Sequence, residues 1–145
     1  MYKIILFILT TILMACGSAE KTVVTFDDLI VYAPRAGSSV TAGFTNISNP
    51  TAQAITVNNI TSPQFNIVEV HETIIDDNGV AKMIKIEKLN IGSKQSIELK
   101  PGGKHLMLID AKKAISEGEE INLIVELSNN QILRLNTPAI SRFSN

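Results

Sequence analysis

The feature that most constrains this chain is a series of short runs of β-branched or alternating apolar residues, separated by turn residues. Glycine- and proline-containing breakers, such as those at 34–37, 76–79 and 101–103, punctuate the pattern. Alternation with period two predicts strands, and glycine and proline supply the turns between them. No long amphipathic helical pattern competes, so we predict an all-β sandwich with one short helical turn at 111–116. The expected strands are 23–26, 29–33, 39–46, 54–61, 65–74, 82–89, 96–99, 105–109, 121–127 and 132–136.

The N-terminus predicts an exported lipoprotein. After the basic Lys3, an apolar stretch at 4–14 is too short to span a bilayer as a helix and is typical of a signal peptide. It ends in Leu-Met-Ala-Cys, which resembles a bacterial lipobox, so cleavage would leave a lipidated Cys16 as the first residue. The alternative is an ordinary secretory signal that ends at a cysteine by chance. Gly17 gives no inner-membrane retention signal, which favours the outer membrane if the cell is Gram-negative.

This interpretation divides the chain into four parts. We expect a signal peptide at 1–15, the lipidated cysteine and a short tether at 16–21, one sandwich domain at 22–138 and a short tail at 139–145. The domain is large enough to bury a core of its own. Cys16 is the single cysteine, so no thiolate or internal disulfide remains in the domain.

Composition and motifs exclude several classes of function. A net charge of −1 gives no reason to expect binding to nucleic acid. No Ser-His-Asp spacing, glycine-rich phosphate loop or His-Glu-x-x-His pattern is present, so we do not expect an enzyme.

Strand parity places both histidines of the chain and two methionines on the side of the sheet that faces away from the core. Successive side chains on a strand point to opposite faces. The expected core residues are Val68, Val70, Ile84, Ile86, Leu106 and Leu108. His71, Met83, His105 and Met107 then point outward, and His105 and Met107 are only about 6.6 Å apart along one strand. A hairpin turn at 76–79 would set the strands of His71 and Met83 side by side, and a tight turn at 101–103 would come just before His105.

The four outward side chains form a soft, neutral ligand set. Thioether sulfur suits Cu(I), and copper accepts imidazole as well. Taken singly, each methionine is more often a flexible core filler, and each histidine is more often a surface or hydrogen-bonded residue. The combination on one face favours a copper(I) site. Either Glu69 or Glu72 could accept the second ring N–H of His71, although a solvated surface carboxylate is the more common role.

The spacing of the four residues resembles the signature of the periplasmic PCu(A)C copper chaperones. Eleven residues separate His71 from Met83, twenty-one separate Met83 from His105, and one separates His105 from Met107. The surrounding segments, Val-Glu-Val-His-Glu at 68–72 and Leu-Lys-Pro-Gly-Gly-Lys-His-Leu-Met-Leu at 99–108, agree with it, and the resemblance covers about residues 22–138.

The resemblance implies a cupredoxin-like, immunoglobulin-like β-sandwich of Greek-key type that holds one Cu(I) through two histidines and two methionines. It also implies delivery of copper to extracytoplasmic sites such as the copper subunit of cytochrome c oxidase or its thiol-type assembly factor. We expect a monomer anchored to the membrane through Cys16 and facing the periplasm. Two alternatives remain: a copper-buffering or tolerance lipoprotein, and an adhesion or assembly module that binds no metal.

Overall fold

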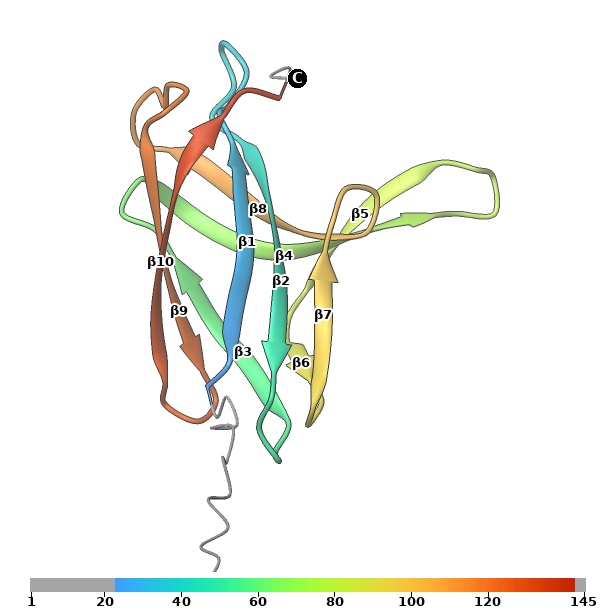
Figure 1. The fold of residues 1–145 in the computed structure, drawn as a ribbon. Coiled ribbons are helices and arrows are strands. Elements are labelled where there is room, and N and C mark those ends of the chain that lie inside the picture. Colours follow the sequence, from blue (N-terminus) through green and yellow to red (C-terminus); the bar gives the residue numbers. More distant parts are fainter. Residues whose placement is uncertain (1–22, 143–145) are drawn as a thin grey trace, which may run out of the picture.

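The computed structural model describes residues 23–142, and all regular structure in this part of the chain is β-strand (Figure 1). No helix within it is long and apolar enough to cross a membrane. The predicted signal peptide, Cys16 and the last three residues lie outside the described residues. The strands are β1 Thr25–Tyr32, β2 Thr41–Asn49, β3 Ile55–Thr61, β4 Phe65–Ile75, β5 Ala81–Ile86, β6 Leu89–Ile91, β7 Gln95–Leu99, β8 Lys104–Ala111, β9 Glu120–Leu127 and β10 Ile132–Ile140.

The strands form two packed layers. One layer has the order β5-β4-β8-β2-β1, with β7 pairing the second half of β2, and the other has the order β10-β9-β3-β6. The end of β10 joins the layers because it pairs in parallel with β1 while the rest of that strand pairs with β9. The expectation of an all-β, cupredoxin-like sandwich is therefore confirmed (Figure 1).

Alternating aliphatic side chains fill the space between the layers. In β9, for example, Ile121, Leu123, Val125 and Leu127 are buried while the residues between them are partly or fully exposed. In β4 and β8 the buried residues include Val68, Val70, Leu106 and Leu108, as the sequence predicts. Because these residues face the core, the intervening residues of β4 and β8 lie on the opposite face of the layer.

One core prediction is wrong at the hairpin of β4 and β5. Ile84 is 46% exposed although it was expected in the core, whereas Ile86 is partly buried and packs against the core. The outer part of this hairpin extends beyond the two-layer body as an arm (Figure 1), and the exposure of Ile84 agrees with a face that no second layer covers. An alternating apolar pattern reports a strand face, and whether another layer covers that face depends on the tertiary structure.

The element predictions differ from the structure at four further places. The strands expected at 23–26 and 29–33 are one strand, β1, whose register against β2 shifts between Asp27 and Ile30 while Asp28 has a φ of 54°. Residues 111–116 contain no helical turn, and β6 was not predicted as a separate strand. β10 continues to Ile140, four residues beyond the expected end at 136, and its last two residues pair with β1.

Candidate metal centre

The two histidines face each other across neighbouring strands. β4 and β8 pair antiparallel with His71 directly opposite His105, and the centroids of the two rings are 6.1 Å apart. In the same ladder Glu69 lies opposite Met107. Residues paired across a ladder share a face, so both imidazoles and the Met107 thioether lie on the side away from the core.

Met83 joins this face from the β4–β5 hairpin. It pairs with Thr73, two residues beyond His71, and its side chain is 59% exposed. The hairpin is set by a turn in which the Asp76 carboxylate accepts hydrogen bonds from the backbone N–H groups of Asn78 and Val80, both at 3.0 Å. Gly79 takes a φ of 77°, a conformation that favours glycine. The expected hairpin between the strands of His71 and Met83 is confirmed.

Two adjoining surface hollows open over the candidate residues. Their volumes are about 320 and 310 Å³, and Met83, His105 and the exposed Arg142 line both of them. Met107 and Arg35 line the second hollow. Among the described residues no carboxylate lines either hollow, whereas Arg142 lines both and Arg35 lines the second.

His105 is buried rather than freely exposed. It is on the predicted face but only 5% accessible, and it lines one hollow together with Tyr32 and Phe44. Its Nδ1 lies 3.0 Å from the carbonyl oxygen of Gly103. A carbonyl only accepts hydrogen bonds, so Nδ1 carries the proton and Nε2 of the neutral ring carries the lone pair. Strand parity thus predicted the face on which His105 lies but not its burial.

The turn at 101–103 holds that carbonyl in place. The backbone N–H of Lys100 donates to the oxygen of Lys104 at 2.7 Å, and that of Gly103 donates to Lys100 at 3.1 Å. Gly102 takes a φ of 76°, which confirms the predicted tight turn. The Gly103 carbonyl also accepts the N–H of Thr73 at 3.1 Å. The same oxygen therefore bonds to His105 and to the base of the β4–β5 hairpin.

His71 is held through its Nε2, whereas His105 is held through its Nδ1. The Nε2 of His71 lies 2.9 Å from the Glu69 carboxylate, while the Nδ1 of this ring is buried and has no hydrogen-bond partner among residues 23–142. Glu72 instead pairs with Lys104 at 2.6 Å, so Glu69 is the partner that sequence analysis left undecided. The bond from His71, followed by that from Lys85, holds the pKa of Glu69 below its usual value.

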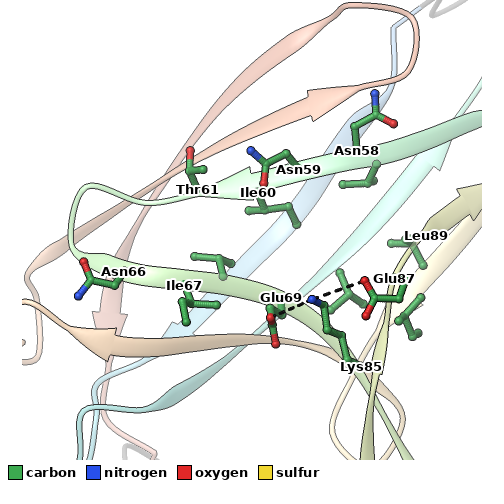
Figure 2. A pocket seen from close by; sticks show the side chains of 14 residues that line it. Asn58, Asn59, Ile60, Thr61, Asn66, Ile67, Glu69, Lys85, Glu87 and Leu89 are labelled. Atoms are coloured by element: carbon green, nitrogen blue, oxygen red, sulfur yellow. Dashed lines mark ion pairs between the residues drawn. The ribbon is translucent and has the colours of Figure 1, made fainter.

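Lys85 links Glu69 to a third hollow, which lies beside the candidate site. Its ammonium group lies 3.1 Å from Glu69 and 3.5 Å from Glu87. Figure 2 shows this group between the two carboxylates, in a hollow of about 330 Å³ between β3 and the β4–β5 hairpin. Salt-bridge formation with the carboxylates, above all Glu69, raises the pKa of Lys85. The sequence alone did not point to Lys85, because the pairing of Lys85 with His71 depends on the register of the hairpin.

The chemistry offered by the described residues is soft and neutral. Within residues 23–142 no three His, Cys, Asp or Glu side chains are grouped so as to hold a metal ion. The two imidazoles each present one nitrogen that bears a lone pair, and the two thioethers lie on the same face. Such a donor set fits a monovalent copper ion better than a hard divalent ion.

Comparison with known proteins identifies relatives in sequence. Residues 24–139 match the family described as "Putative lipoprotein LpqE-like". The uncharacterized protein RP573 of Rickettsia prowazekii (strain Madrid E) is 36% identical over 66 residues, which are 45% of this chain and 36% of that protein. "Putative lipoprotein Lxx21020" of Leifsonia xyli subsp. xyli is 30% identical over 94 residues, 64% of this chain and 56% of that protein. The matched segments thus span less than two thirds of these relatives.

Solved structures share the fold at low sequence identity. The apo PCuAC domain from PmoF1 superposes with a TM-score of 0.69 at 17% identity and covers 81% of this chain and 93% of that domain. The Cu(I) form of DR1885 from Deinococcus radiodurans gives a TM-score of 0.68 at 20% identity and covers 89% and 85% of the two chains. The copper-bound PCuAC domain from PmoF2 gives 0.68 at 14% identity, covering 81% and 92%. With the sandwich fold of PCuAC domains and a family match over residues 24–139, this chain belongs to the LpqE-like lipoprotein family.

Proposed function

We propose that this protein binds one Cu(I) ion through His71, Met83, His105 and Met107 and delivers it to an acceptor outside the cytoplasm. The observation that carries the proposal is the buried Nδ1 of His71. It has no partner within the described residues and belongs to a ring that faces His105 on the face shared with both methionines. A buried nitrogen without a partner costs about 1–3 kcal/mol, and a bound metal ion would remove that cost.

The surroundings of the site favour a monovalent ion. All four proposed ligands are neutral, and two arginines line the hollow that contains Met83 and Met107. A divalent ion would meet about twice the repulsion from these cations that Cu(I) meets. Thioether donors add to this preference because they are soft ligands.

Delivery rests on the proposed anchor and on the exposure of one ligand. Acylation of Cys16 would hold the domain on the periplasmic side of a bacterial membrane, the outer membrane in a Gram-negative cell. Met83, on the protruding hairpin, is open to an incoming ligand, whereas His105 is buried. Copper would leave by stepwise ligand exchange toward the copper subunit of cytochrome c oxidase or a thiol-bearing assembly factor. Copper-bound and Cu(I) forms of structurally similar proteins support this cargo.

The test is anaerobic Cu(I) titration of residues 17–145 in competition with a chromogenic chelator. This part of the chain contains every described strand and the whole core. We expect one equivalent to bind tightly and a Met83→Leu/Met107→Leu variant to lose competitive binding. Ile75→Leu is the control, because Ile75 is an exposed residue on the Met83 face of the same hairpin. A parent protein that does not compete with the chelator would refute copper carriage and favour a module that binds no metal.

A cellular measurement separates delivery from buffering. Under limiting copper, a strain that lacks the protein should lose cytochrome oxidase activity if the protein delivers copper. Retained oxidase activity together with copper sensitivity would instead assign a buffering or tolerance role.

A further inference from the structure

We infer that the two histidines present opposite ring nitrogens to the metal, His71 through Nδ1 and His105 through Nε2, and that Glu69 is the positioning residue that fixes this choice for His71. The inference rests on the proposed function, since it concerns how the same site is prepared for the ion. It assigns a role to a carboxylate that would not itself touch copper.

The assignment for His71 follows from what its partner can accept. A neutral imidazole has one N–H donor and one lone pair, and an ionised carboxylate only accepts hydrogen bonds. Glu69 lies 2.9 Å from Nε2, so that nitrogen carries the proton. Nδ1 then carries the lone pair, is buried, and has no partner within the described residues. A ring in the other tautomer would place two lone pairs together at Glu69 and bury an unpaired N–H.

The assignment for His105 uses the same reasoning with a different acceptor. The Gly103 carbonyl fixes the proton on Nδ1 and leaves Nε2 for the ion. This carbonyl belongs to the backbone of the turn at 101–103, so no side-chain substitution removes it. Of the two hydrogen-bond acceptors, Glu69 is therefore the one that a substitution can remove.

Lys85 holds the Glu69 carboxylate in the position that this role needs. It stands directly opposite His71 in the β4–β5 ladder and reaches the second oxygen of Glu69, Oε1, at 3.1 Å. The carboxylate is thus held between an imidazole and an ammonium group, each bonded to a different oxygen. With one oxygen held by Lys85, the other oxygen stays in place to accept the N–H of His71 Nε2.

Ring-nitrogen NMR of metal-free protein tests the tautomers directly. The chain has two histidines, so ¹⁵N shifts of the ring nitrogens at about pH 8, where imidazole is neutral, give a simple spectrum. We expect His71 with its proton on Nε2 and His105 with its proton on Nδ1. Glu69→Ala should move His71 toward a mixture of tautomers and leave His105 unchanged. Glu69→Gln keeps an acceptor oxygen and should change the tautomer of His71 less than Glu69→Ala does. It also provides the test if the alanine variant does not fold.

Cu(I) affinity is the second readout, measured by chelator competition on the same proteins. Loss of a partner that orients a metal-binding histidine typically costs about 10- to 100-fold in metal affinity, and we expect a loss of that size for Glu69→Ala. Glu72→Ala is the matched control, because it removes a carboxylate next to His71 that pairs with Lys104 instead. It should change neither the tautomer nor the affinity.

Two results would overturn the inference. One is a wild-type His71 that carries its proton on Nδ1. The other is a Glu69→Ala variant that binds Cu(I) as tightly as Glu72→Ala does. A wild-type domain that takes up no Cu(I) would refute the proposed function, and the metal-free spectra alone would then decide the ring-nitrogen assignment.

Discussion

The exposure of the β4–β5 hairpin predicts unequal costs for two similar truncations. Leu106 is 1% exposed, and Ile84 is 46% exposed on the core-side face of β5. Either change to alanine removes three carbons, worth about 2.4 kcal/mol at full burial. Leu106→Ala also leaves a cavity, which brings the expected loss to roughly 3–5 kcal/mol. Ile84 buries about half of its side chain and borders solvent, so Ile84→Ala should cost only about 1.3 kcal/mol with no cavity cost.

Urea unfolding of residues 17–145 measures the difference. The chain contains no tryptophan, so far-UV circular dichroism is the appropriate probe. Both variants should keep the parent slope of free energy against urea, because neither change alters the surface exposed on unfolding by much. Equal losses of stability would show that Ile84 is packed as deeply as Leu106, and would refute the description of the hairpin as an arm outside the sandwich.

Three further predictions concern ligands, acid and a buried amide. Met83→Leu and Met107→Leu should each lower Cu(I) affinity by at least about tenfold in chelator competition while changing stability by less than about 1.5 kcal/mol, because leucine keeps the volume and removes the sulfur. Lys113 lies 2.8 Å from Glu119 and holds the pKa of that carboxyl below its usual 4.5. The stability that this ion pair contributes is therefore present above about pH 4.5 and is lost as pH falls through the lowered pKa. Glu119→Gln should flatten the acid side of the curve of stability against pH measured by urea unfolding. The Asn49 amide is 1% exposed and donates to three backbone carbonyls, so Asn49→Ala should cost about 2–3 kcal/mol, and an unchanged urea midpoint would contradict that.

Local patterns predicted much of the sandwich and the face of the candidate site. In β4 and β8 the alternation of aliphatic and polar residues places Val70 and Leu106 inward, and thereby His71 and His105 on the other side. The turn residues at 76–79 and 101–103 predicted the β4–β5 hairpin and the tight turn before His105, because glycine is favoured where φ is positive. These features depend on residues close together in the sequence.

Features that depend on strand register or on the packing of distant segments could not be predicted from the sequence. The pairing of Lys85 with Glu69 requires the β4–β5 register, and the proton on Nδ1 of His105 requires a particular backbone carbonyl at Gly103. Burial of His105 depends on Tyr32 and Phe44, which come from earlier strands. β6 has only three residues, too few for an alternating pattern to mark it as a separate strand.

The parallel pairing of β1 with the end of β10 has a consequence for when the domain can fold. β1 lies between β2 and β10, so a growing chain that has not yet reached residue 139 leaves one edge of its first strand without a partner. Contacts between residues so distant in sequence slow folding, because the long loop must close before they form. The two layers therefore join only after residue 140 is available, and under the export proposed above the chain would stay unfolded until β10 has emerged.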